Sequence, residues 1–266
     1  MIRVAINGFG RIGRCSLRQI MEMKNMEVVA INDLTDSLQL AYLYKYDSIH
    51  RTIKEKVACE DDYIEIDGKK IKVYSESDPT KLPWKELKVD LVLECTGAFT
   101  SKEKSMRHIE AGAKRVLISA PAKDECKTIV YGVNEKIIDK NDKVLSAASC
   151  TTNCLAPVLN LLNKCFCVES GFMSTVHAIT NDQETLDIPH KKGIESRRGR
   201  AASLNIVPTS TGAASTIGKV IPELNGKLEG SSYRVPVGDG SLVDLMVNVK
   251  KTVTKEEVND MFKHNS

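Results

Sequence analysis

Short apolar runs alternate with helical patterns through the first half of the chain. The runs at 4–6, 28–32, 91–95 and 115–118 have the length and composition of buried strands. Between them, apolar residues recur every three or four positions, which is the period of a helix packed on one face. This alternation predicts an α/β fold. Beyond residue 150 the strands become longer and the helices fewer, which predicts an α+β arrangement.

The change of pattern divides the chain into two predicted domains. Its 266 residues fit about two domains of ordinary size. We place the first at 1–149 and the second at 150–266. In the second, the segment 171–180 alternates with a period of two and places Met173, Thr175, His177 and Ile179 on one face.

Other local signals predict a hairpin and a helix in the first domain. Asp67-Gly68 lies between two β-like runs, which is typical of a hairpin over 63–73. The segment 101–112 begins at a serine and ends at a glycine, as a capped helix does. Within this helix we expect His108 on the surface. Trp84, near two prolines, is expected to be a packing residue.

Composition narrows the classes of function. The apolar share of 42% and the charged share of 27% are those of a soluble globular protein. A net charge of +3 gives no reason to expect nucleic acid or a membrane surface as the main partner. No apolar run is long enough to span a bilayer, and the chain begins with a strand rather than a secretory leader. The eight cysteines lack zinc-site spacing, so we expect no metal and a reducing, cytoplasmic compartment.

The first chemical motif is a glycine-rich turn. Gly8, Gly10 and Gly13 follow the first strand and open a helix, and Asp33 ends the second strand. Such glycines let the backbone approach a pyrophosphate at the helix N-terminus. Asp33 would accept hydrogen bonds from an adenosine ribose and repel a 2′-phosphate, which predicts NAD rather than NADP. An ordinary turn between strand and helix is the alternative interpretation.

Two later strands end at hydroxyl side chains. Thr96 follows the strand at 91–95, and Ser119 follows the strand at 115–118. Ligands of open parallel sheets bind at the carboxyl ends of the strands. Thr96 and Ser119 are therefore candidate cofactor contacts, although simple turn chemistry explains them equally well.

The strongest chemical signal is Ser149-Cys150-Thr151-Thr152-Asn153-Cys154. Cys150 lies where an apolar strand ends and a helical pattern begins, and a helix N-terminus favours the thiolate. Hydroxyls of Ser149 and Thr151 can donate to an oxyanion or a phosphate. A buried thiol among capping residues is the alternative for an isolated cysteine. Cys154, one helical turn on, is expected to be packed rather than reactive.

A cysteine nucleophile needs a base, and His177 is the best placed histidine because it lies in the alternating strand. Arg197, Arg198 and Arg200 follow in a polar loop, which is either an anion site or a solvated basic turn. Arg234 lies in a β-like run, where an unpaired charge is costly, so an anionic ligand would account for it.

Four segments together resemble the glyceraldehyde-3-phosphate dehydrogenase family, and the resemblance extends in order along the whole chain. They are Asn7–Gly13, Ser149–Cys154, Pro208–Ala214 and Pro222–Lys227. The resemblance implies a Rossmann-type NAD-binding domain, a catalytic domain with a mixed sheet, and a homotetramer. It implies the NAD-dependent oxidative phosphorylation of D-glyceraldehyde 3-phosphate to 1,3-bisphosphoglycerate in glycolysis, with inorganic phosphate as co-substrate.

The resemblance also implies a role for each matching residue. Cys150 would be the nucleophile, forming a thiohemiacetal and then a thioester, and His177 would be the base. The implied NAD contacts are Arg11, Ile12, Asp33, Thr96 and Ser119. The implied ligands of the substrate phosphate are Thr180, Asp182 and Arg234. The implied ligands of the attacking phosphate are Ser149, Thr151, Arg198, Thr211 and Gly212.

The sequence departs from the family at two places. Ser77 stands where many members carry an arginine, and the chain stops at Ser266, before the family's further strands, an asparagine-containing segment and a C-terminal helix. We therefore expect a C-terminally truncated chain to lose most activity and stability. A catalytically impaired NAD-binding or interaction protein is one alternative, and an erythrose-4-phosphate dehydrogenase is another.

Overall fold

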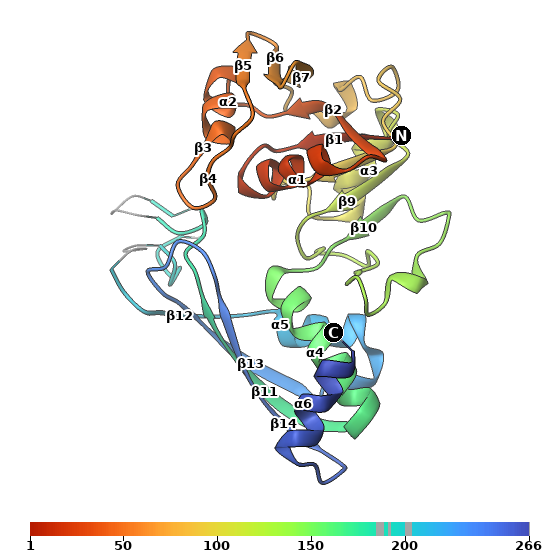
Figure 1. The fold of residues 1–266 in the computed structure, drawn as a ribbon, viewed down its shortest axis with the longest axis vertical. Helices are drawn as coiled ribbons and strands as arrows, with labels where there is room; N and C mark the ends of the chain where they lie inside the picture. Colours follow the sequence, from red (N-terminus) through yellow and green to blue (C-terminus); the bar gives the residue numbers. More distant parts are fainter. Residues whose placement is uncertain (185–188, 191–192, 200–203, 266) are drawn as a thin grey trace. The chain divides into compact units, whose positions relative to one another are not determined.

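The computed structural model describes residues 1–184, 189–190, 193–199 and 204–265 (Figure 1). The chain forms two compact units. The first comprises Met1–Ile129 and Ile137–Ala148, and the second comprises Val130–Lys136 and the chain from Ser149 onward. The domain boundaries at 1–149 and 150–266 stay a prediction.

An eight-stranded sheet forms the centre of the first unit, in the order β10-β9-β8-β1-β2-β7-β6-β5. The strands from β10 to β7 are parallel, and β6 and β5 extend the sheet as an antiparallel hairpin. Their bounds are β1 Ile2–Asn7, β2 Met26–Asn32, β5 Val57–Glu60, β6 Tyr63–Ile66, β7 Lys69–Tyr74, β8 Leu91–Glu94, β9 Arg115–Ile118 and β10 Val144–Ser146. A short antiparallel pair, β3 Tyr46–Asp47 and β4 Arg51–Thr52, lies apart from this sheet.

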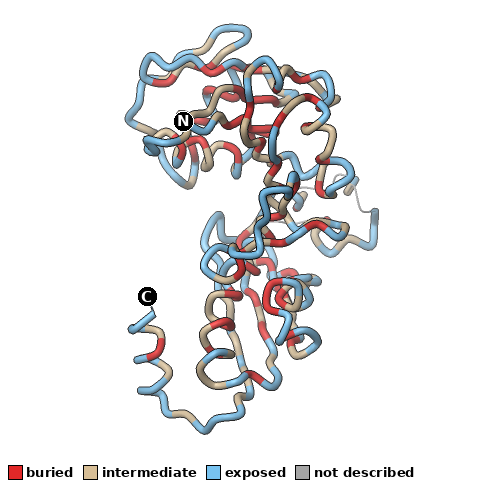
Figure 2. Tube along the Cα trace, turned by 90° about the vertical axis from the view of Figure 1, so that its right-hand side faces the viewer, coloured by how far each residue is buried: buried red, intermediate tan, exposed pale blue. Residues whose placement is uncertain are grey.

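Helices cover both faces of this sheet, because neighbouring strand residues point to opposite sides. Ala5 and Val92 belong to a core cluster that includes residues of α3, whereas Ile6 belongs to a cluster that includes residues of α1 and α2. The helices are α1 Arg11–Glu22, α2 Ser37–Lys45 and α3 Lys102–Glu110, with a short 3-10 turn at Pro79–Lys81 (η1). A further 3-10 turn, Glu135–Ile137 (η2), spans the boundary between the two units. Figure 2 shows buried positions in the interior of the first unit and exposed positions along its outer loops. This is the α/β arrangement that the alternation of strands and helices predicts.

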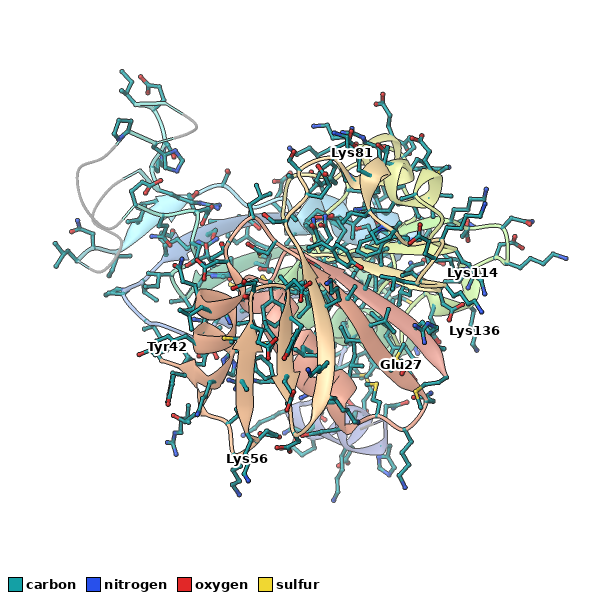
Figure 3. All side chains as sticks on the ribbon, turned by 90° about the horizontal axis from the view of Figure 1, so that it is seen from above. Glu27, Tyr42, Lys56, Lys81, Lys114 and Lys136 are labelled. Atoms are coloured by element: carbon teal, nitrogen blue, oxygen red, sulfur yellow. The ribbon has the colours of Figure 1, made fainter. Side chains whose placement is uncertain are left out.

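The predicted hairpin and packing residue of the first unit are confirmed. Asp67 and Gly68 have φ of 47° and 82°, as a tight hairpin turn requires, and Trp84 is fully buried. The prediction that His108 lies on the helix surface is wrong. Its side chain is fully buried because its two ring nitrogens pair with Trp84 and Glu94. By contrast, Lys56 and Lys114 extend from the surface (Figure 3).

A four-stranded mixed sheet forms the second unit, in the order β12-β13-β11-β14. β11 and β13 are parallel, and the other two pairings are antiparallel. The strands are β11 Val168–His177, β12 Val207–Thr209, β13 Leu228–Arg234 and β14 Leu242–Val249. The helices are α4 Cys150–Phe166, α5 Ala213–Val220 and α6 Lys255–His264, with a 3-10 turn at Pro222–Leu224 (η3).

The two faces of the second sheet differ in burial. Met173 and Thr175 of β11 are buried, and α4 and α5 pack against the sheet. The alternate positions form an exposed apolar face, since Phe172 pairs with Met246, and Val176 pairs with both Leu242 and Tyr233. No helix within the described ranges is long and apolar enough to cross a bilayer. The same residues hold no cluster of three metal-ligating side chains.

Candidate active site

The glycine-rich turn joins β1 to α1 through close backbone packing. Gly8 has a φ of 89°, and a Cβ there would lie 2.6 Å from the backbone nitrogen of Thr96. A Cβ on Gly13 would collide with the Gly8 carbonyl. Gly10 is the N-cap of α1, and no side chain caps the helix there. The first N–H groups of α1 are thus left without a side-chain partner, which suits an anionic pyrophosphate.

Asp33 and Arg11 lie beside this turn. The Asp33 carboxylate accepts from the backbone N–H of Phe9 at 2.7 Å and from that of Thr35 at 3.0 Å. Arg11, the first residue of α1, points its guanidinium toward Asp47, with 3.4 Å between Nη1 and Oδ1. Ile12, the next residue, is exposed.

The residue that anchors Arg11 was not found from the sequence. The Asp47 carboxylate is almost fully buried and accepts from the backbone N–H of Ile49 and of His50, each at 2.8 Å. Burial opposes its ionisation, but these hydrogen bonds and the Arg11 charge outweigh burial and lower the pKa of Asp47. No local pattern links Asp47 to Arg11, because 36 residues separate them.

Thr96 follows β8, the neighbour of β1, and Ser119 follows β9, the next strand of the sheet. The Thr96 N–H donates to Glu94 Oε1 at 2.8 Å, and the Ser119 N–H donates to the Glu94 carbonyl at 3.0 Å. All eight predicted cofactor residues therefore lie at one edge of the sheet or at the start of α1. They are Gly8, Gly10, Arg11, Ile12, Gly13, Asp33, Thr96 and Ser119.

In the second unit, Cys150 is the first residue of α4. Ser149 caps the helix, because its hydroxyl accepts from the Thr152 N–H at 3.1 Å. Ala148, just before the cap, has a left-handed φ of 60°, which turns the chain sharply out of β10. Such a conformation costs a residue with a Cβ about 1–2 kcal/mol. The Thr151 hydroxyl lies 4.0 Å from the Cys150 sulfur.

His177, at the end of β11, lies beside this thiol. Its Nε2 is 3.3 Å from the Cys150 Sγ. The hydrogen bond to His177 lowers the pKa of Cys150 from its ordinary 9.0 to about 7, although burial opposes the shift. The same hydrogen bond raises the pKa of His177. The pair is thus arranged to form a thiolate and an imidazolium near neutral pH.

Arg234, at the end of β13, holds the other side of the imidazole. Its Nη1 donates to the Ala178 carbonyl at 2.8 Å and to the Thr180 hydroxyl at 3.1 Å. His177 Nδ1 lies 2.7 Å from the same carbonyl and 2.8 Å from Arg234 Nη1, while Nε2 faces the sulfur. Arg234 is 8% exposed, and its Nε has no hydrogen-bond partner among the described residues, so the cation has donors left for an anion.

A chain of polar contacts continues from Arg234 to the arginine loop. The Thr180 hydroxyl donates to Asp182, and Asp182 pairs with Arg198 at 2.6 Å. Burial opposes the ionisation of Asp182, but the hydrogen bonds from Thr180 and Arg198 prevail and lower its pKa. Gln183, which the sequence did not single out, accepts from the Thr180 N–H at 3.3 Å, and its buried Nε2 has no partner within the part of the chain that the structure describes.

The arginine loop reaches the start of α5. Arg198 Nε donates to the Thr209 hydroxyl at 3.0 Å, and the Thr211 hydroxyl accepts from the Ala213 N–H at 3.2 Å. Gly212 is the N-cap of α5 and has no side chain to cap it. Arg197 is exposed, and Arg200 lies outside the described residues.

The cysteines differ in environment. The prediction that Cys154 is packed is wrong, because its side chain is exposed on the face of α4 that also carries Cys150. Burial raises the pKa of both Cys95 and Cys126 to about 11. The pKa of Cys150 is lowered, whereas those of Cys95 and Cys126 are raised.

Comparison with known proteins covers both units. Residues 2–102 match the family model "Glyceraldehyde 3-phosphate dehydrogenase, NAD binding domain", and residues 149–266 match "Glyceraldehyde 3-phosphate dehydrogenase, C-terminal domain". The chain is 56% identical over 263 residues to the glyceraldehyde-3-phosphate dehydrogenase of Clostridium pasteurianum and 54% identical to that of Clostridium acetobutylicum. Each match covers 99% of this chain and 78% of the relative.

Proposed function

Since the chain belongs to the glyceraldehyde-3-phosphate dehydrogenase family, we propose that it converts D-glyceraldehyde 3-phosphate to 1,3-bisphosphoglycerate, with NAD and inorganic phosphate. Both the predicted family and the NAD-binding domain are confirmed. The observation that carries the proposal is the Cys150–His177 pair at the start of α4, 3.3 Å apart.

Cys150 is proposed as the nucleophile. Its thiolate, stabilised by His177 and by hydrogen bonds from Thr151, adds to the aldehyde carbon of the substrate to give a thiohemiacetal. Backbone N–H groups at the start of α4 stabilise the developing oxyanion. The His177 imidazolium donates its Nε2 proton to this oxyanion, and the neutral Nε2 accepts the hydroxyl proton back as the thiohemiacetal is oxidised to a thioester. The contacts of Nδ1 with the Ala178 carbonyl and with Arg234 Nη1 keep the imidazole in the required orientation.

Two anion sites flank the pair in this proposal. Arg234, Thr180 and Asp182 bind the substrate phosphate, with Arg234 supplying the charge. Ser149, Thr151, Arg198, Thr211 and Gly212 bind the inorganic phosphate that attacks the thioester. This division is supported by the helix starts of α4 and α5, which each offer N–H groups to an anion.

The cofactor residues of the first unit fit NAD. The turn at Gly8–Gly13 approaches the pyrophosphate, and Asp33 accepts from the adenosine ribose. Arg11, Ile12, Thr96 and Ser119 line the same edge and complete the proposed contacts. The chemistry that NAD supplies when bound is that of a hydride acceptor.

The test is NADH production from glyceraldehyde 3-phosphate, NAD and phosphate. The unaltered protein should turn over, Cys150→Ser should not, and Cys154→Ser should keep its activity as the matched control. Without phosphate, the thioester should accumulate and release at most one NADH per Cys150. NAD binding without NADH from this aldehyde would contradict the proposal, and faster turnover of erythrose 4-phosphate would reassign the substrate.

We further propose a homotetramer in the cytoplasm. The exposed apolar face of the second sheet supports self-association, since Phe172, Val176, Leu242 and Met246 would be covered by a second copy. All eight cysteines are free, which suits a reducing compartment. Native mass spectrometry should give the mass of four chains, and Met246→Lys should lower it. The predicted domain boundaries, 1–149 and 150–266, assign NAD binding and catalysis to separate halves.

A further inference from the structure

Four polar side chains lie buried beneath the glycine-rich turn, where the parallel strands end. Asn7, Asn32 and Glu94 are the last residues of β1, β2 and β8, and they occupy matching positions in the strand pairing. Asn7, Glu94 and His108 of α3 are each at most 1% exposed, and Asn32 is 4% exposed. Burying such groups is costly unless each finds its hydrogen bonds.

Glu94 is the centre of this network. Its Oε2 accepts from Asn7 Nδ2 at 2.5 Å and faces His108 Nε2 at 3.2 Å. Its Oε1 accepts from the Thr96 N–H at 2.8 Å and from the Thr96 hydroxyl. Four donors from three different segments thus converge on one carboxylate. The carboxylate fixes the orientation of each donor group.

The tautomer of His108 follows from its second partner. The Trp84 indole N–H donates to His108 Nδ1 at 3.0 Å, so Nδ1 must be an acceptor. The ring proton therefore lies on Nε2, where it is donated to Glu94. Trp84 is fully buried, and its indole stacks on the imidazole with ring centroids 6.3 Å apart. His108 is thereby fixed both in protonation site and in orientation.

The network extends from Glu94 to the next two strands. Asn7 Oδ1 accepts from Asn32 Nδ2 at 2.7 Å, and Asn32 exchanges two hydrogen bonds with the backbone of Glu76, each 2.9 Å long. The loop after β7 is thus tied to the ends of β1, β2 and β8. Every one of these ends belongs to the edge where the cofactor residues lie.

The network contacts the cofactor turn at two points. Asn7 immediately precedes Gly8, and Thr96 is the residue whose backbone packs against Gly8. The Thr96 hydroxyl, directed by Glu94, accepts in turn from the Ala98 N–H at 3.0 Å, which fixes the loop after β8. We propose that Glu94 and His108 are positioning residues for NAD, acting through Asn7 and Thr96 to hold the glycine-rich turn in its binding geometry. This inference rests on the proposed cofactor site.

The test compares substitutions in the network with one at the other end of the same strand. Glu94→Gln replaces an acceptor with a donor that faces donors. Asp90→Asn, just before β8, removes a carboxylate that accepts from the Arg3 N–H and from Lys114, but far from the turn. We expect Glu94→Gln to raise the dissociation constant of NAD and of ADP-ribose, measured by calorimetry, about 10- to 100-fold, as loss of a charge-assisted hydrogen bond does. Asp90→Asn should leave both unchanged.

A second pair of variants keeps the inference testable if Glu94→Gln does not fold. His108→Gln retains one donor for Glu94 and one acceptor for Trp84, whereas His108→Leu retains neither. We expect His108→Gln to bind NAD within a few-fold of the unaltered protein and His108→Leu to bind at least tenfold more weakly. Equal affinities for these two, or unchanged affinity in folded Glu94→Gln, would overturn the inference. Failure of the unaltered protein to bind NAD would instead overturn the proposed cofactor site.

Discussion

Replacing His177 with asparagine should change how the reactivity of Cys150 depends on pH. The hydrogen bond from His177 is the main cause that lowers the Cys150 pKa from 9.0 to about 7. A thiol reacts only as thiolate, so reactivity is lost as pH falls through the pKa. In the unaltered protein this loss should occur around pH 7. In His177→Asn it should occur near the ordinary value of a thiol.

Two opposing effects set the reaction rate of Cys150 in the variant relative to the unaltered protein. At pH 7 the thiolate fraction is about one half in the unaltered protein and about 1% in the variant, a ratio of roughly 50. A thiolate of higher pKa is intrinsically more nucleophilic, by about eightfold over two units at a Brønsted slope of about 0.45. The variant should thus react about sixfold more slowly at pH 7. Above pH 9 it should react severalfold faster, so the two profiles should cross near pH 8.

The assay is modification by a small aromatic disulfide between pH 5.5 and 10, with each cysteine followed by peptide mass spectrometry. Cys154 is the internal control, because it is exposed on the same helix and is not part of the pair, so its profile should be the same in both proteins. Parallel profiles for Cys150, with the variant slower at every pH, would show that His177 does not set the thiolate population.

Three further predictions concern the first unit. Asp33→Gly should reduce the preference for NAD over NADP at least tenfold in calorimetric titrations, and equal binding of both by the unaltered protein would refute this role of Asp33. Gly8→Ala should abolish NAD binding and lower the melting temperature, because the new Cβ would lie 2.6 Å from the Thr96 nitrogen and the backbone has a φ of 89°. Unchanged NAD binding and melting temperature would contradict that packing. Asp47→Asn should cost about 2 kcal/mol in urea unfolding at pH 7. Because the pKa of Asp47 is lowered in the folded protein, its contribution to the free energy of unfolding is present above pH 4 and is lost as the pH falls further. The stabilities of the unaltered protein and of Asp47→Asn should therefore converge in acid, and a difference that stays constant with pH would refute this.

Much of the site was predictable because its signals are local. The turn at Gly8–Gly13 needs residues without a Cβ, and that requirement is visible in the sequence. The start of α4 at Cys150 follows from the apolar period and from the capping hydroxyl of Ser149. The alternation in β11 correctly placed His177 on the face of buried Met173.

The predictions that were wrong depend on contacts between distant segments. His108 is buried because Trp84, 24 residues away, and Glu94, 14 residues away, satisfy its ring nitrogens, and no helical period reveals that. Cys154 lies four residues after Cys150, so it shares the open face of α4 while Leu155 and Leu159 face the core. The helical spacing predicted the buried leucines, but it did not show that the Cys154 thiol would be accessible.

Trp84, described above as a partner of His108, is the one tryptophan in the sequence and lies within the first unit. Its emission therefore reports the unfolding of that unit alone, whereas circular dichroism follows the backbone of both. Heating the protein while recording the two signals would separate the melting of each half without dissecting the chain. Coincident curves would mean that the halves unfold together, and an offset would measure how far their stabilities differ.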